Sequence, residues 1–189
     1  NVGAYSLVAA RLAVGEITVH SFEPSFSTYF DLCQNILLNH CQSSVYPHLM
    51  ALGRFTGLSV FNYSSLDSGA AVHSLGGHFD QTGQEFEPAY SQPVVSFSID
   101  DLVGKLRFAH PNLLKIDVDG TEGDIVSGAE ATLGHPDLRS VLIEFYEPDQ
   151  RHRQVIAVLE SLGLDVNERV PHPNGVANYI FIRRAAGGP

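Results

Sequence analysis

The stretch Ile17-Thr18-Val19-His20-Ser21-Phe22-Glu23 is typical of a β-strand, because it is rich in β-branched residues. It ends in a carboxylate, which is the main indication of the fold class. Glu23 lies 20 residues after Gly3 of the opening segment Asn1-Val2-Gly3-Ala4-Tyr5-Ser6. In doubly wound α/β domains, a glycine loop cradles a nucleotide-like cofactor and an acid at the end of the next strand binds its ribose hydroxyls. This order and spacing predict an α/β domain that binds an adenosine-containing cofactor.

A further strand is expected before the loop, because the cofactor loop of such a domain follows a buried first strand. The sequence begins at Asn1, which already lies inside the predicted loop. We therefore expect the first strand of the fold to precede these 189 residues.

The composition is that of a globular domain. The chain has 189 residues, of which 44% are hydrophobic and 17% are charged. A chain of this length can bury most of its apolar surface without disulfides or metals, so we expect a single domain over residues 1–184 and a flexible tail over residues 185–189. No apolar stretch reaches the roughly 18 residues that a membrane helix needs, which predicts no membrane partner.

Charge and cysteine content limit the kinds of partner and the cellular compartment that we expect. The net charge of −10, from 11 basic and 21 acidic residues, argues against nucleic acid, which requires clustered Lys and Arg. Cys33 and Cys41 are the only cysteines. We interpret them as free thiols of a reducing compartment, which favours a cytoplasmic protein. We expect a small-molecule substrate as the partner. The sequence does not decide between a monomer and a homo-oligomer.

Strand-like and helix-like patterns alternate along most of the chain, which predicts a mostly parallel sheet flanked by helices. The predicted strands are 17–22, 45–52, 94–99, 113–118 and 140–146, with 164–170 and 178–183 as a closing antiparallel pair. The predicted helices are 5–13, 26–39, 100–106, 125–133 and 155–162. The fold class is therefore α/β and Rossmann-like, with helices on both faces of the sheet.

Residues 53–93 interrupt this alternation, because they are rich in glycine and poor in helix formers. An insertion of this length is typical of a functional loop or lid, so we expect it to recognise substrate. His73 and His78 place two imidazoles in this segment, close in sequence to Asp80. A histidine is the natural general base near neutral pH, and two of them with a carboxylate could hold a divalent metal. Exposed loop residues are the alternative interpretation for both.

Acidic residues mark the ends of two predicted strands. Asp117 and Asp119 are two apart, which would place both side chains on one face of the strand 113–118. Open α/β sheets bind their ligands at the carboxyl ends of strands, so both acids are site candidates. Glu144 interrupts an apolar strand, where a carboxylate is costly unless it reaches a cleft. Thr121 and Asp124 form a helix-start signal, which favours capping.

One block carries a resemblance to a known family. The segment Lys115-Ile116-Asp117-Val118-Asp119-Gly120-Thr121-Glu122, followed by Ser127-Gly128-Ala129, resembles the signature of FkbM-type methyltransferases. The opening loop, Phe22-Glu23-Pro24 and Leu142-Ile143-Glu144 are similar in content and order. This resemblance implies an S-adenosylmethionine-dependent O-methyltransferase with a seven-stranded class I fold, acting on hydroxyls of polyketide-like or sugar-containing metabolites.

The predicted methyl-transfer chemistry suggests roles for single residues. Asp117 would lie beside the transferred methyl group and contact the cofactor. Asp119 would orient the substrate or a cation, or else cap the following helix. Glu144, His73 and His78 are the further catalytic candidates. The cofactor-binding set would consist of Asn1, Gly3, Ser6, Glu23, Leu52 and Asp117. We assign no metal ligands, although a divalent metal would be compatible with the acids.

Two other classes of protein stay open. An NAD(P)-dependent oxidoreductase also uses a glycine loop and a ribose-binding acid, but it has no need of the block 115–122. A non-catalytic cofactor-binding domain could keep the fold without the chemistry, because a fold does not fix function.

Overall fold

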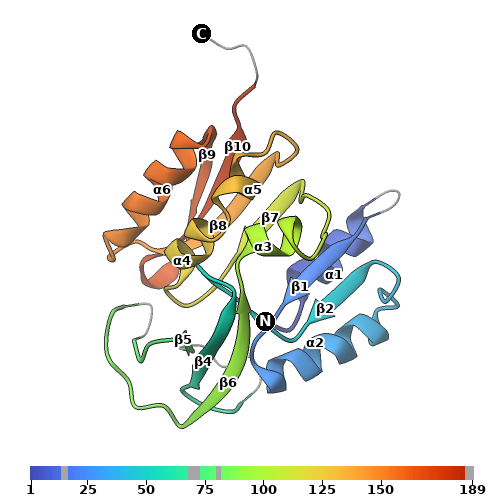
Figure 1. The fold of residues 1–189 in the computed structure, drawn as a ribbon, viewed down its shortest axis with the longest axis vertical. Coiled ribbons are helices and arrows are strands. Elements are labelled where there is room, and N and C mark those ends of the chain that lie inside the picture. Colours follow the sequence, from blue (N-terminus) through green and yellow to red (C-terminus); the bar gives the residue numbers. More distant parts are fainter. Residues whose placement is uncertain (14–16, 68–72, 80–81, 186–189) are drawn as a thin grey trace. The chain divides into compact units, whose positions relative to one another are not determined.

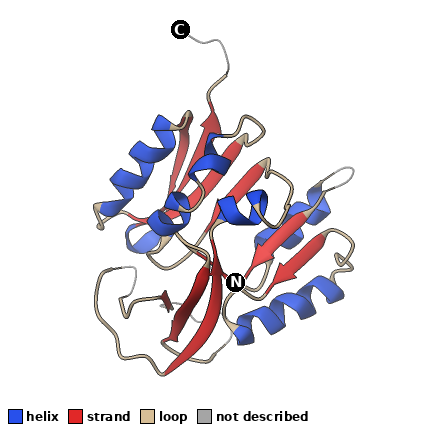
Figure 2. Cartoon of the chain, in the orientation of Figure 1, coloured by secondary structure: helices blue, strands red, loops and turns tan. Residues whose placement is uncertain are grey.

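The computed structural model in Figure 1 describes residues 1–13, 17–67, 73–79 and 82–185. The chain forms two compact units, and helices and strands occur in both (Figure 2). The first unit comprises Asn1–Ala51, Leu58–Gly77 and Glu87–Ser96, and the second comprises Leu52–Gly57, His78–Phe86 and Phe97–Pro189. The fold is therefore mixed α/β. Among the described residues, no helix has both the length and the apolar character needed to cross a membrane.

The first unit opens with two helices and a parallel pair of strands. These elements are α1 (Ala4–Leu12), β1 (Val19–Phe22), α2 (Phe26–Leu38) and β2 (Val45–His48). β1 and β2 pair in parallel, with Val19 opposite Val45. Ser25 caps α2, because its hydroxyl accepts a hydrogen bond from the Thr28 amide. Side chains of both helices pack against Val19 and Val45, so the two helices cover one face of this pair.

A second sheet follows, with the strand order β3-β6-β4-β5. Its strands are β3 (Ala51–Leu52), β4 (Gly57–Tyr63), β5 (Ser74–Leu75) and β6 (Tyr90–Phe97). Its core is a cluster of Ala51, Phe61, Tyr63 and Val94. The segment 53–93, predicted to be mostly irregular, thus contributes strands to a sheet. The predicted strand 45–52 is wrong as one element, because a turn from His48 to Met50 separates β2 from β3.

The second unit contains a four-stranded mixed sheet with the order β7-β8-β10-β9. The strands are β7 (Leu113–Ile116), β8 (Ser140–Tyr146), β9 (Leu164–Pro171) and β10 (Val176–Arg183), with the short 3-10 turn η1 (Pro173–Gly175) before β10. The helices are α3 (Ile99–Gly104), α4 (Glu122–Ser127), α5 (Glu130–Gly134) and α6 (Arg151–Ser161). β7 runs parallel to β8, whereas β10 is antiparallel to both β8 and β9.

Strict alternation along β8 decides which face of this sheet is buried. Val141, Ile143 and Phe145 are at most 3% exposed, and the residues between them are partly exposed. The buried set packs with apolar residues of α4, α5 and α6, which lie over this sheet in Figure 1. Glu144 therefore points to the opposite face, because successive strand residues alternate between faces.

Most predicted elements are confirmed within a few residues, including the closing antiparallel pair. Three further expectations need correction. The sheet is only partly parallel, since the strands lie in three sheets and both parallel and antiparallel pairs occur among them. The strand 113–118 ends at Ile116. The helix predicted over 125–133 is two short helices, α4 and α5, with Gly128 and Ala129 between them.

Arg183, the last residue of β10, donates hydrogen bonds to backbone carbonyls at the C-terminal ends of two helices. Its guanidinium donates to the backbone carbonyls of Leu133, Leu138 and Leu162, and to that of His135 at 3.0 Å. Leu133 lies in the last turn of α5, and Leu162 is the residue that ends α6. One side chain thereby satisfies carbonyls that the helices leave without an intrahelical partner.

We predict that Arg183→Ala lowers the free energy of unfolding by roughly 2–4 kcal/mol, because several partly buried carbonyls lose a charged donor. Arg184→Ala is the matched control, since Arg184 forms an exposed ion pair with Asp165 and its loss should change stability much less. Urea unfolding of both variants measures the difference. Equal losses would contradict this role of Arg183.

Candidate active site

The carboxyl end of β7 carries a lysine and an aspartate in direct contact. The Lys115 ammonium forms an ion pair with the Asp117 carboxylate. Asp117 and Asp119 follow the last strand residue, Ile116, so they do not share a face of β7 through strand alternation as expected. Gly120 has a φ of 92°, which turns the chain away from the sheet direction directly after them.

Glu144 joins this charged group from the neighbouring strand. Ile116 lies opposite Ile143 in the parallel pairing, so the residues that follow them, Asp117 and Glu144, come at the same edge of the sheet. Burial raises the pKa of Glu144, and the negative charge of Asp117 raises it further. The Lys115 charge acts in the opposite direction. We call Lys115, Asp117 and Glu144 the edge cluster.

The edge cluster continues onto β10. Asn178 lies directly opposite Glu144 in the antiparallel pairing of β8 and β10. Its amide nitrogen is 2.7 Å from Nε2 of His172, whose charge lowers the pKa of Glu144. The structure thus brings together two of the predicted catalytic residues, Asp117 and Glu144, and surrounds them with groups that donate hydrogen bonds or carry positive charge.

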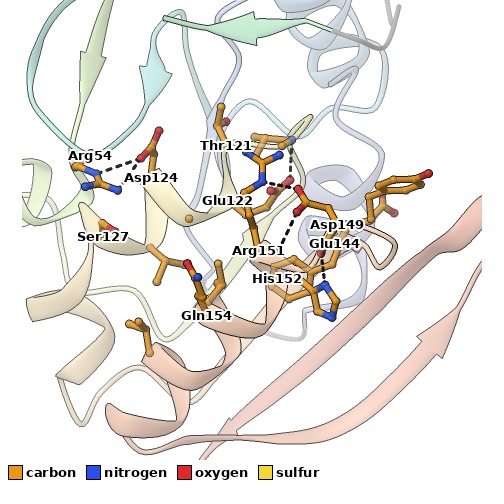
Figure 3. Close-up of a pocket in the computed structure, with 18 residues that line it drawn as sticks. Arg54, Thr121, Glu122, Asp124, Ser127, Glu144, Asp149, Arg151, His152 and Gln154 are labelled. Carbon is orange, nitrogen blue, oxygen red and sulfur yellow. Dashed lines mark hydrogen bonds and ion pairs between the residues drawn. The ribbon is translucent and has the colours of Figure 1, made fainter. Parts of the chain in front are cut away.

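A cavity of about 300 Å³ lies at the start of α4 and α6 (Figure 3). Glu122 lines it, and one of its carboxylate oxygens accepts a hydrogen bond from the Gly120 amide at 3.0 Å. Burial raises the pKa of Glu122 to about 7, against the lowering effect of its backbone hydrogen bonds. The Asp119 charge raises this pKa as well, and the Arg151 charge lowers it. Glu122 can therefore hold or release a proton near neutral pH.

Two ion pairs border this cavity. Arg54 contacts Asp124 at 3.1 Å, and Arg151 contacts Asp149 at 2.5 Å. Gly128 helps to place Arg54, because a Cβ at Gly128 would lie 2.2 Å from the carbonyl oxygen of Gly53. Only glycine permits this approach of the two backbone segments.

The predicted capping of α4 is wrong in its detail. Thr121 occupies the position before the helix, but its side chain makes no capping hydrogen bond. Asp124 lies in the first turn and contacts Arg54 instead.

Glu23 is a buried acid of the first unit. It follows β1 directly and is 7% exposed. Its Oε1 accepts a hydrogen bond from the Ser25 amide at 2.8 Å, and its Oε2 contacts the backbone nitrogen of Asn1. The structure therefore brings Asn1 and Glu23 together. A buried carboxylate of this kind can accept hydrogen bonds from hydroxyl donors.

The remaining loop residues have mainly structural contacts. Gly3 has a φ of 95°, and a Cβ there would lie 2.5 Å from the Leu32 side chain, so the turn before α1 requires glycine. The Ser6 hydroxyl is 2.7 Å from that of Ser21. Both contacts hold α1 against its neighbours.

The other predicted site residues have different surroundings. Leu52 packs against the core of the second unit. His73 packs beside Phe61 and Tyr63 in the first unit, which corrects its interpretation as an exposed loop residue. His78 is exposed and belongs to the second unit, and Asp80 lies outside the described residues. In the parts of the chain that the structure describes, no group of three or more His, Cys, Asp or Glu could hold a metal.

Reasoning from the sequence missed Glu122 as a site residue. The sequence suggested only an acid in the first turn of a helix, where it interacts favourably with the helix dipole. Arg151 and Arg54 were missed as well, because they come from segments far apart in the sequence. The available signal for Glu122 was its place at the end of the block 115–122.

Comparisons with known proteins agree on one family. The family model described as "Methyltransferase FkbM domain" matches residues 1–166. The chain is 25% identical to "Methyltransferase 1" of Beauveria bassiana over 201 residues, which covers 97% of this chain and 78% of that protein. It is also 25% identical to "Methyltransferase sdnD" of Sordaria araneosa over 195 residues, covering 88% of this chain and 71% of that protein.

A solved structure supports the fold. The chain resembles the crystal structure of "Methyltransferase FkbM" from Methylobacillus flagellatus, with a TM-score of 0.60 and 14% identity. The match covers 95% of this chain, which spans only 40% of the length of the solved chain.

We predict that Glu122→Gln raises the free energy of unfolding above that of wild type, and that this gain is larger at pH 8 than at pH 5. The folded-state pKa of about 7 lies above the ordinary value of 4.5, so the folded protein binds more protons between these values and loses stability as pH rises. Glutamine removes this loss, which we expect to reach roughly 1–3 kcal/mol at pH 8.

Urea unfolding at pH 5 and pH 8 measures this change, and Glu130→Gln is the control because Glu130 is exposed. If the stability difference between Glu122→Gln and wild type is the same at both pH values, Glu122 does not titrate in this way.

Proposed function

Because the chain belongs to the family of methyltransferase FkbM domains, we propose that it transfers a methyl group from S-adenosylmethionine to a hydroxyl of a small metabolite. The match of the family model over residues 1–166 is the observation that carries this proposal. The acceptor would be a polyketide-like or sugar-containing compound. We also propose that the mixed sheets belong to a Rossmann-like class I methyltransferase fold.

Glu23 would hold the ribose of the cofactor. Its burial and its hydrogen bond from the Ser25 amide support this role, because both oxygens of a fixed carboxylate can accept from adjacent hydroxyls. Asn1, Gly3 and Ser6 would form the loop beside the cofactor, and Leu52 would contact the adenine. The net charge of −10 suits a cofactor that carries a sulfonium and an ammonium group.

S-adenosylmethionine would supply a methyl group on sulfur that a hydroxyl oxygen can attack. The protein must then hold the hydroxyl in place, exclude water and accept its proton. The edge cluster fits this task, since Asp117 and Glu144 are acceptors close to the ammonium of Lys115. The raised pKa of Glu144 makes it a stronger base than an ordinary glutamate. Asp119 would orient the acceptor.

The cavity beside Glu122 would receive part of the acceptor. Its volume of about 300 Å³ suits a small molecule, and it is lined by both charged and apolar side chains. With a pKa of about 7, Glu122 can donate a hydrogen bond to an acceptor oxygen when protonated or accept a proton when ionised. His73 and His78 have weaker support as bases, since His73 is packed among aromatic rings of the first unit and His78 is exposed.

The test measures transfer of labelled methyl from S-adenosylmethionine to a panel of hydroxyl-bearing metabolites. We predict that Asp117→Asn lowers kcat about 100-fold or more, because it removes a carboxylate of the edge cluster while keeping its size. Asp137→Asn is the control, since Asp137 is an exposed acid of the same unit.

Calorimetry with S-adenosylhomocysteine shows whether the variant still binds cofactor. An unchanged rate in Asp117→Asn would remove Asp117 from the mechanism. Cofactor binding without transfer to any hydroxyl compound would favour the non-catalytic binding domain.

A further inference from the structure

Helix α2 buries only one of its sides within the first unit. That side carries three residues spaced four apart, Thr28, Leu32 and Ile36, and all are at most 3% exposed. A surface helix normally has charged and polar residues on its other side. α2 departs from this rule, because Asp31 is the only charged residue among its 13 residues.

The other side of α2 is apolar and exposed. It carries four residues at the spacing i, i+4, i+7 and i+11, which are Phe26, Phe30, Cys33 and Leu37. Phe26 is 43% exposed, Phe30 and Leu37 are each 61% exposed, and Cys33 is partly exposed. We call these four residues the outer stripe. A helix that is apolar on both sides is normally covered on both, so the outer stripe is suited to contact with a second apolar surface.

We propose that the outer stripe binds the outer stripe of a second copy of this chain, with the two α2 helices antiparallel around a two-fold axis. Its spacing is that of a coiled-coil seam, in which alternate a and d positions face a partner helix. A two-fold interface uses the same patch on both copies, so the patch must be complementary to itself. The outer stripe meets this requirement, because its spacing of four, three and four residues reads the same in both directions. The proposal does not depend on methyl transfer.

Side-chain size favours the antiparallel orientation. In that orientation Phe30 of each copy faces Cys33 of the other copy. Phe26 likewise faces Leu37, so every layer of the seam contains one phenylalanine and one smaller side chain. A parallel pair would instead place two Phe30 rings in one layer and two Cys33 side chains in the next. Crowded and underfilled layers of this kind both cost packing energy.

The charges around the seam do not oppose pairing. The helix positions that flank the outer stripe are Ser27 and Gln34 on one border and Tyr29 and Ile36 on the other, and none of them is charged. Depletion of charge at the centre of a patch is typical of surfaces that bind other proteins. The net charge of −10 on each copy acts only at longer range. Salt screens such repulsion, so it should strengthen the dimer.

The size of the outer stripe indicates a weak dimer. At a rise of 1.5 Å per residue, the stripe is about 16 Å long. Its exposed side chains offer on the order of 300–400 Å² per copy, so the whole interface should stay below about 1,200 Å². Interfaces of this size are typical of reversible association. We therefore expect a dissociation constant of about 10–100 µM.

Sedimentation equilibrium over about 5–500 µM protein tests the proposal, because this range spans the expected dissociation constant. Wild type should change reversibly from monomer to dimer. Phe30→Glu should weaken the dimer at least about 100-fold, because two carboxylates would enter an apolar seam. This variant should fold normally, since Phe30 is exposed.

Leu12→Glu is the matched control, because it makes a similar change at a residue of α1 that is 75% exposed. It should dimerise as wild type does. The proposal is overturned if wild type remains a monomer at the highest concentration, which would leave the outer stripe to a different partner. It is also overturned if Phe30→Glu dimerises as wild type does, or if Leu12→Glu loses as much affinity.

A disulfide experiment tests the orientation of the helices. The triple variant Phe26→Cys, Cys33→Ser and Leu37→Cys is oxidised, and the linked peptides are identified by mass spectrometry. Positions 26 and 37 of one helix are about 16 Å apart, which is too far for a disulfide within one chain. The antiparallel dimer predicts links between position 26 of one copy and position 37 of the other. Links that join position 26 to position 26 would overturn this arrangement.

Discussion

The parallel pairing of β7 with β8 is the constraint on which the candidate active site depends. It places Asp117 and Glu144 at one edge of the sheet, because each residue follows one of the paired isoleucines, Ile116 and Ile143. The buried apolar face of β8 packs under three helices and thereby directs Glu144 to the opposite face. A register shift of one residue would bury this carboxylate in the core. The arrangement of the acids therefore follows from the packing of the sheet.

Much of the fold could be predicted from local patterns. β8 was predicted with its observed bounds, because its alternation of apolar and partly exposed residues is strict. Glu144 was recognisable for the same reason, since a carboxylate in such a strand needs a polar neighbour. The end of β7 was not predictable, because Asp117 and Val118 continue the strand pattern and only the turn at Gly120 shows where pairing stops. The short strand β5 was not predicted, because glycines close to it break the periodicity.

Long-range contacts explain what the sequence could not reveal about the site. The pKa of Glu122 depends on burial in a cavity whose walls come from α4, α6 and the segment around Arg54. No spacing rule predicts that Gly128 and Gly53 touch, although this contact brings Arg54 beside Asp124. Glu23 differs, because the prediction of its role depends on a loop, a strand and an acid that are close in sequence. The role of Glu23 could therefore be predicted from the sequence alone and stays a prediction, whereas the surroundings of Glu122 required the structure.

Calorimetry with S-adenosylmethionine tests most directly whether Glu23 binds the ribose of a methyl donor. We predict that wild type binds the cofactor and that Glu23→Gln binds it about tenfold or more weakly, because an ionised acceptor is lost. Glu87→Gln, at an exposed glutamate of the same unit, should bind as wild type. Absence of binding by wild type, or equal binding by Glu23→Gln, would contradict the account.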